Sequence, residues 1–412
     1  MGRIQAAYAW LGRYRPDILV WVIVAVTSVL GYLSYVRNLG LFYYDSRYYM
    51  AFAFWFSGDS QQVARDRTAE FAAMWHIPMP DAATTFGWGL VQPRVVLPFL
   101  SAPFMNLFGP YGLAVIPAVA TVVFTILLTL VMKRRYGNLA AVATVVLMNA
   151  SLRIVVLTTG MLTESLSALW SLVALMLTWR YIREPRWWLL VLIGLVTLLS
   201  GFTRQATLIM AGAFAMAWLL GMLVTRRWRS PWMWPAIVVG ATTVVTQVAQ
   251  TALWPFSQTD QFLRITGSST LTEALSHVPG LAKLLLFTDL KTFMATDKPL
   301  LFILFLSVAG MVIFWRRAEA HLLFGAIIAI AVYNITNGTA TGFRYAIPGL
   351  AFFMLNVALV LAATAQRLRS PGDAEAETEH AAAESPDPWA PPLTGSPDSG
   401  GSRESRAEGQ RR

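Results

Sequence analysis

The sequence predicts an all-α fold: a polytopic transmembrane helical bundle of about ten spans, with a surface or re-entrant helix in its first outer loop. Of its 412 residues, 56% are hydrophobic and 13% are charged, about half the charged share of a typical soluble domain. Apolar stretches recur along the chain, and many could cross a bilayer as a helix of roughly 20 residues. This composition excludes a soluble enzyme, a disulfide-stapled secreted module and a nucleic-acid-binding protein.

Ten apolar segments are predicted to span the membrane. In chain order they are Ile18–Tyr35, Tyr111–Met132, Leu139–Ala150, Leu162–Trp179, Trp187–Gly201, Gln205–Val224, Trp232–Leu253, Pro299–Trp315, Leu322–Ile335 and Ile347–Ala365. The third segment is too short unless it continues through Ser151–Leu157. An eleventh apolar segment, Arg94–Phe108, is short and contains two prolines. Proline disrupts a helix interior, so length and composition do not settle whether this segment crosses the membrane. The distribution of charged residues is therefore used to decide.

Basic residues gather in six clusters. If Arg94–Phe108 does not cross, all six fall on one side: Arg3/Arg13/Arg15, Lys133/Arg134/Arg135, Arg180/Arg183/Arg186, Arg226/Arg227/Arg229, Arg316/Arg317 and Arg367/Arg369. Cytoplasmic loops of membrane proteins carry an excess of Lys and Arg. The pattern therefore predicts that both termini are cytoplasmic and that Arg94–Phe108 lies along the outer surface or re-enters. Two long loops, residues 36–110 and 254–298, are then outside.

The chain divides into three predicted parts. Residues 1–17 are a cytoplasmic N-terminus whose basic residues precede the first apolar run, which indicates an uncleaved signal-anchor. Residues 18–365 are the transmembrane domain. Residues 366–412 are a cytoplasmic tail, predicted to be disordered because it is acidic and rich in Pro, Gly, Ser and Ala. We expect a multi-pass protein of the cell membrane with an extracytoplasmic working face.

Asp45 is the first candidate for chemistry, because it lies in the first outer loop among five aromatic residues: Phe42, Tyr43, Tyr44, Tyr48 and Tyr49. A carboxylate that aromatic rings partly shield from water can have a raised pKa, which suits a general base. The alternative is structural. Asp is a favoured N-cap, and a helix is expected to begin near Ser46.

Glu164 is the second candidate and falls within the first turn of a predicted membrane helix. A carboxylate there interacts favourably with the positive end of the helix, and Thr159 or Thr163 could cap that helix. This is the structural interpretation. The functional one is that an ionisable group so close to hydrocarbon is costly and marks a site.

Arg204 and Arg344 each stand between apolar runs on the predicted outer face. A lone arginine there could simply end a helix and extend its head to water. Two arginines converging from different helices could instead clamp a phosphate or pyrophosphate, because a guanidinium matches phosphate oxygens bidentately. Gly338 and Gly342 would let the backbone approach such a ligand closely.

Other signals are weaker or missing. Arg94 begins the predicted surface helix, where it could reach a lipid phosphate. The chain has no Cys, and its four His are scattered at positions 76, 277, 321 and 380. No metal site and no cofactor are predicted, although a divalent metal requirement is left open. No phosphate-cradling Gly loop and no Gly-x-Ser-x-Gly motif is present, which excludes nucleotide-driven and serine-hydrolase mechanisms.

Taken in order, four motifs resemble those of the GT-C superfamily of integral-membrane glycosyltransferases, which use polyprenyl-phosphate-linked sugars as donors. The resemblance covers about residues 18–365. The motifs are Asp45-Ser46-Arg47-Tyr48-Tyr49 in the first outer loop, Gly160–Glu164 opening a helix with a Thr-Glu pair, Gly201–Gln205 with a Thr-Arg turn, and Phe343–Pro348, which is similar to an Arg-Tyr-x-x-Pro before the last helix.

The resemblance implies roles for these residues. Asp45 would act as general base on an acceptor hydroxyl, which displaces polyprenyl phosphate with inversion at the anomeric carbon. Arg204 and Arg344 would hold the departing phosphate. The further substrate-binding candidates are Tyr48, Tyr49, Arg94, Glu164, Gln205 and Tyr345. One departure is that many members carry two adjacent acidic residues in this loop, whereas Ser46 follows Asp45 here.

The implied partners are a polyprenyl-phosphate donor of mannose or another hexose or pentose, a lipid or glycan acceptor, and membrane lipids, with no nucleic acid. Two other classes were compared. A transporter or flippase of lipid-linked sugars would carry charged residues through the bundle interior at mid-membrane depth, whereas the ionisable residues here gather toward one face. A scaffold subunit would not depend on Asp45, Glu164 or Arg204 for any turnover.

Overall fold

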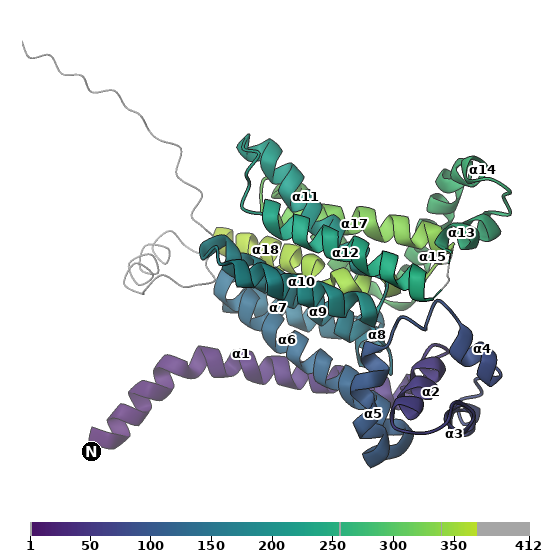
Figure 1. Cartoon of the computed structure of the whole chain (residues 1–412). Helices are drawn as coiled ribbons and strands as arrows, with labels where there is room; N and C mark the ends of the chain where they lie inside the picture. Colours follow the sequence, from purple (N-terminus) through teal and green to yellow (C-terminus); the bar gives the residue numbers. More distant parts are fainter. Residues whose placement is uncertain (1, 255–256, 339, 369–412) are drawn as a thin grey trace, which may run out of the picture.

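The computed structural model describes residues 2–254, 257–338 and 340–368, which form a helical bundle with a group of short helices at one end (Figure 1). Within these ranges the regular structure is α-helix and short 3-10 helix, without strands. The all-α prediction is therefore confirmed. The last helix runs to Leu368, past the predicted start of the tail at residue 366. From residue 369 onward, the predicted disorder lies outside the described residues.

Most predicted spans are long apolar helices. Those able to cross a membrane are α1 (Gly2–Leu39, apolar from Asp17), α9 (Glu164–Arg183), α11 (Thr207–Thr225), α12 (Met233–Leu253), α17 (Ala318–Asn337), α18 (Leu350–Leu368) and the joined stretch Val96–Tyr136. The bent pair α7 (Asn138–Ala150) and α8 (Leu152–Thr159) makes an eighth. Two apolar helices are shorter: α10 (Trp187–Thr203) and α16 (Lys298–Ile313). The described chain is thus polytopic with seven or eight candidate spans, and the total of about ten stays a prediction.

Successive spans run in opposite directions, so the bundle has two ends (Figure 1). One of them, which we call the loop end, carries the helices of the two long loops. These are α2 (Ser46–Phe56), α3 (Gln61–Ala73), α4 (Ala82–Gly87), α5 (Val96–Phe108), η1 (Gly109–Ala114), α13 (Gln258–Thr266), α14 (Leu271–Ser276) and α15 (Val278–Thr296). The 3-10 helix η2 (Arg344–Gly349) leads from this end into α18, and α6 (Val115–Tyr136) enters the bundle from it.

The core of the bundle surrounds α18. Every residue of Leu350–Leu359 is buried, and the helix packs against α7, α16 and α17. A helix that is apolar on all sides is stable when neighbours enclose it. By contrast, only 17% of the apolar part of α1 is buried, so α1 presents most of its surface to surrounding lipid.

The third predicted span is broken. Instead of one helix through residues 139–157, α7 and α8 meet at an angle of 80° around Ser151. The Asp297 carboxylate holds this break: it accepts hydrogen bonds from Ser151 Oγ and Arg153 N, both at 2.8 Å, and caps α16 through Leu300 N at 3.0 Å. One buried carboxylate therefore ties α8 to the start of α16, a pairing that local sequence does not reveal.

The segment predicted as a surface or re-entrant helix forms α5, which packs against α2 at the loop end. The chain then folds back through η1. Gly112 lies so close to α5 that an added Cβ would stand 2.3 Å from the carbonyl oxygen of Phe104. Only glycine fits this contact, and α6 continues into the bundle after it.

A buried ion pair joins two helices at the opposite end. Glu319 at the start of α17 accepts hydrogen bonds from Arg135 and, at 3.2 Å, from the Tyr136 hydroxyl of α6. Replacing Glu319 by Gln should destabilise the fold by about 3–5 kcal/mol, because Arg135 would keep its buried charge without a partner. Thermal unfolding in detergent measures this. Glu184→Gln is the matched control, since that carboxylate pairs with Arg186 while half exposed, and equal melting temperatures for both variants would contradict the prediction.

Candidate active site

Five charged residues that are far apart in the sequence meet at the loop end. They are Asp45 before α2, Arg94 shortly before α5, Glu164 at the start of α9, Arg204 in the α10–α11 turn and Arg344 at the start of η2. We call them the ion cluster. The cluster is not sealed, because the side chains of Asp45 and Arg344 remain 23% and 24% exposed. A substrate can therefore reach both.

Asp45 stands at the N-cap position of α2, but its side chain does not cap the helix. It accepts a hydrogen bond from Arg344 Nη2 at 2.7 Å, and Arg94 Nη1 lies 3.8 Å away. The capping alternative therefore fails for the side chain, which turns toward the arginines and away from the helix backbone.

Glu164 bridges two arginines. It is the first residue of α9 and completely buried, and its Oε1 accepts hydrogen bonds from Arg204 Nη1 at 2.6 Å and from Arg344 Nε. Thr163 provides no side-chain cap. The predicted helix-terminal position is confirmed, yet the principal partners of the carboxylate are the two arginines. Arg204 and Arg344 thus converge on one carboxylate, which fits the clamp alternative better than two unrelated helix ends.

Arg94 approaches the cluster from another direction. It is 5% exposed and donates a hydrogen bond to the hydroxyl of Tyr49, at 2.8 Å. Tyr345 packs beside the ion cluster. The Arg204 guanidinium lies 5.2 Å from its ring centroid, and the ring of Tyr333 packs edge-on against the ring of Tyr345. Tyr333 was not among the sequence-predicted residues.

Two predicted site residues lie apart from the cluster. The ring of Tyr48 packs on Trp88 at 4.6 Å, and its hydroxyl accepts a hydrogen bond from Arg47. Gln205 follows Arg204 directly but lines a separate cavity beside α12 and α13. Neither contacts Asp45 or Glu164 in the hydrogen bonds described.

Ser46 has a structural task that the sequence did not reveal. Its buried hydroxyl donates to the carbonyl oxygen of Met161 at 2.8 Å and accepts from the backbone N–H of Tyr43 at 3.0 Å. Met161 lies in the turn that leads into α9. The serine that stands where many GT-C members have a second acidic residue therefore pins the start of α2 beside Glu164.

The cluster carries a net positive charge, since three arginines face two carboxylates. The Nε groups of Arg94 and Arg204 are buried and have no hydrogen-bond partner among the described residues. A buried charged donor without an acceptor is costly, so the site favours an additional anion. Phosphate fits, because its oxygens match guanidinium geometry. In the part of the chain that the structure describes, no three His, Cys, Asp or Glu side chains are grouped to hold a metal ion.

The predicted direction of the Asp45 pKa is wrong. Burial alone would raise the pKa of this carboxyl, but the guanidiniums of Arg344, Arg94 and Arg204 outweigh burial and hold the pKa below its ordinary value of 3.8. The neighbours that decide this direction, Arg94, Arg204 and Arg344, come from distant segments. Asp45 is therefore an ionised carboxylate that is engaged by arginines.

Comparison with known proteins finds a family similarity over the middle of the chain. Residues 92–249 match the model of the family described as dolichyl-phosphate-mannose-protein mannosyltransferase. The matched range contains Arg94, Glu164 and Arg204, whereas Asp45 and Arg344 lie outside it. A search of curated proteins finds no significant match.

Proposed function

We propose that this chain, a membrane glycosyltransferase of the GT-C type, moves a sugar from a polyprenyl-phosphate donor to a lipid or glycan acceptor at the extracytoplasmic face of the cell membrane. The observation that carries the proposal is the ion cluster: two carboxylates and three arginines converge at the loop end. The basic residues that end α6, α9 and α18, and those between α11 and α12 and between α16 and α17, lie at the other end of the antiparallel spans, which supports an extracytoplasmic loop end.

In the proposed reaction, Asp45 accepts the proton of an acceptor hydroxyl. The hydroxyl oxygen forms a bond to the anomeric carbon while the bond from that carbon to the phosphate oxygen breaks. Polyprenyl phosphate departs with the electron pair, and the configuration inverts. Arg204 and Arg344 stabilise the charge that develops on the leaving phosphate, and the proton later passes from Asp45 to water.

A lipid donor is supported by an apolar cavity of about 690 Å³ between α1, α6 and the α7–α8 break. Its lining reaches Thr159, directly before Gly160. Gly160 packs so tightly under Tyr43 that an added Cβ would lie 2.9 Å from that ring, and Asp45 follows two residues after Tyr43. The cavity thus adjoins the segment that carries the base, and we propose that the isoprenoid chain lies in it.

A photoreactive polyprenyl phosphate should then label α1 or α6.

The flippase alternative has less support. Among the described residues, the buried charged and imidazole side chains lie at or near helix ends: Arg94, Arg135, Glu164, Arg204, Asp297, Glu319 and His321. A pathway for a charged headgroup would need polar partners at mid-membrane depth. The arrangement favours chemistry at one end of the bundle over passage through it.

The class is tested with purified protein in nanodiscs, radiolabelled polyprenyl-phosphate mannose, arabinose, glucose and galactose, and a membrane lipid extract as acceptor source. We expect transfer from one of these donors. Donor binding without transfer, together with movement of labelled lipid across liposomes, would contradict the transferase and favour a flippase.

The pH dependence of the transfer rate should differ between the free enzyme, which kcat/KM reports, and the donor complex, which kcat reports. In the free enzyme the low pKa of Asp45 keeps it ionised, so kcat/KM should show no acid limb until below about pH 4. Donor phosphate competes for Arg344, which weakens the effect that lowers the pKa, so the acid limb of kcat should lie at higher pH. Initial rates over a range of donor concentrations at each pH measure both. Acid limbs of kcat and kcat/KM at the same pH, or an acid limb of kcat/KM above about pH 5, would contradict the transfer of Arg344 from Asp45 to the donor phosphate.

A further inference from the structure

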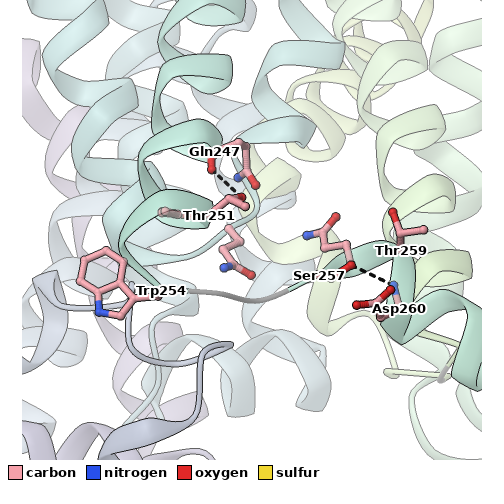
Figure 2. A pocket seen from close by; sticks show the side chains of 9 residues that line it. Gln247, Thr251, Trp254, Ser257, Thr259 and Asp260 are labelled. Carbon is pink, nitrogen blue, oxygen red and sulfur yellow. Dashed lines mark hydrogen bonds between the residues drawn. The ribbon is translucent and has the colours of Figure 1, made fainter.

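A second cavity, of about 520 Å³, opens at the loop end between the α10–α11 turn, α12 and the start of α13. In Figure 2, Gln247 and Thr251 on α12 stand across a gap from Ser257, Thr259 and Asp260. The described lining consists of four glutamines, three hydroxyl residues, one tryptophan and one aspartate. The volume lies within the range of about 300–1,000 Å³ that is typical of small-ligand sites.

The chemistry of this lining differs from that of the ion cluster. Amides and hydroxyls both donate and accept hydrogen bonds, and the only charged group in the described lining is Asp260. A phosphate would find no cation here and would be repelled by that carboxylate. A neutral polyol fits, because its hydroxyls can pair with amides and its C–H faces can pack against Trp254.

Two amide oxygens in this lining have no hydrogen-bond donor. They belong to Gln205 and Gln250, which are 5% and 3% exposed. Gln250 Nε2 donates to the carbonyl oxygen of Gly201 at 2.9 Å, which fixes the amide orientation and leaves Oε1 as the free acceptor. An unmet buried acceptor is costly, and because each oxygen exposes less than 1 Å², a ligand hydroxyl would satisfy it only when the amide shifts toward the cavity.

A polar stripe on α12 forms one wall of the cavity. Gln247, Gln250, Thr251 and Trp254 are spaced by three, four and seven residues, which puts them on one helix face. Val245 on the opposite face of this span, and Val244 and Val248 on the flank of the stripe, are exposed and apolar. Lipid contact explains those valines, whereas the polar stripe needs a polar partner.

The cavity adjoins the ion cluster through the chain itself. Gln205 follows Arg204, whose Nη1 lies 2.6 Å from Glu164. We propose that this cavity binds a neutral sugar residue of the substrate, with its hydroxyls on Gln247, Gln250 and Thr251. The sugar residue belongs either to the donor or to the acceptor glycan. This choice rests on the proposed function, whereas sugar binding in the cavity does not depend on it.

Binding is tested without turnover. Saturation-transfer difference NMR of the purified full chain would use the methyl glycosides of mannose, arabinose, glucose and galactose as probes. At least one should bind, and inorganic phosphate should not displace it. The double variant Gln247→Leu/Thr251→Val should bind about tenfold more weakly, as expected for the loss of one or two hydrogen bonds. Thr242→Val, the same kind of change on the α10 side of α12, should bind as the wild type does.

The outcomes distinguish this proposal from the proposed function. A raised KM for donor alone in the double variant assigns the cavity to the donor sugar, and a raised KM for acceptor alone assigns it to the acceptor. Glycoside binding that depends on Gln247 and Thr251 without any transfer would support the cavity and reject the transferase. Absence of binding by every glycoside, or wild-type binding and KM values in the double variant, would overturn the proposal.

Discussion

Asp45→Asn should lower the rate of sugar transfer by about a hundred- to ten-thousandfold, the range that a positioned general base contributes. The amide keeps an oxygen that can accept the hydrogen bond from Arg344, so the fold and the arginine cluster should persist. It cannot take a proton from the acceptor. Single-turnover transfer measured beside equilibrium donor binding should show loss of the first and retention of the second.

The matched control for this experiment is Asp66→Asn, an exposed carboxylate on α3 in the same segment between α1 and α6. It should transfer sugar at the wild-type rate. If Asp45→Asn retains more than about a tenth of wild-type kcat, Asp45 is not the base, although the similarity of residues 92–249 to a mannosyltransferase family would be unaffected. Equal loss of donor binding and transfer would show that Asp45 holds the site together and does not act on the acceptor.

Arg344→Ala should reduce kcat/KM by about 10²–10³, the usual loss when a donor group aimed at transition-state charge is removed. Arg344 contacts both Asp45 and Glu164, and in the proposed reaction it moves to the phosphate. Donor affinity should therefore fall together with kcat. Arg344→Lys should recover only part of the activity, because an ammonium is a single point charge that cannot bridge two groups as a planar guanidinium does.

Arg264→Ala, which removes an exposed arginine of α13 at the same end of the bundle, controls for a general loss of positive charge. Steady-state kinetics with varied donor, and direct donor binding, give the comparison. Full activity of Arg344→Lys would assign Arg344 a purely electrostatic role. Unchanged donor affinity in Arg344→Ala would contradict its place in a phosphate clamp.

Much of the ion cluster could be predicted because each member sits where an apolar run ends. Glu164, Arg204 and Arg344 interrupt hydrophobic sequence at helix boundaries on one predicted side, and an ionisable residue there is costly unless it is used. Alternating spans bring such boundaries to one end of a bundle. The end of the bundle at which these residues lie could therefore be predicted from the sequence.

Pairing within the cluster could not be predicted. Whether Asp45 meets an arginine, and hence whether its pKa rises or falls, depends on lateral neighbours 299 positions apart. The contact between Ser46 and Met161 is of the same kind. Hydrophobic periodicity indicates where a helix lies in depth, but it does not specify which helices are adjacent.

The break between α7 and α8 and the polar stripe of α12 both have signals in the sequence. Ser151 is a favoured N-cap residue inside a predicted apolar run, which marks the break between α7 and α8. The polar stripe of α12, including Gln247 and Gln250, is visible as helical spacing. Its significance depends on the cavity beside α13, which requires the fold.

The measurement that tests the central claim most directly is product analysis of a single turnover. Purified protein is mixed with the donor that it uses, and the released lipid and the anomeric configuration of the product are determined together by mass spectrometry and NMR. Direct displacement, with Asp45 as base and the arginines on the phosphate, predicts one equivalent of polyprenyl phosphate per sugar transferred and an inverted anomeric centre. Retained configuration, or release of lipid pyrophosphate or free sugar phosphate, would contradict it.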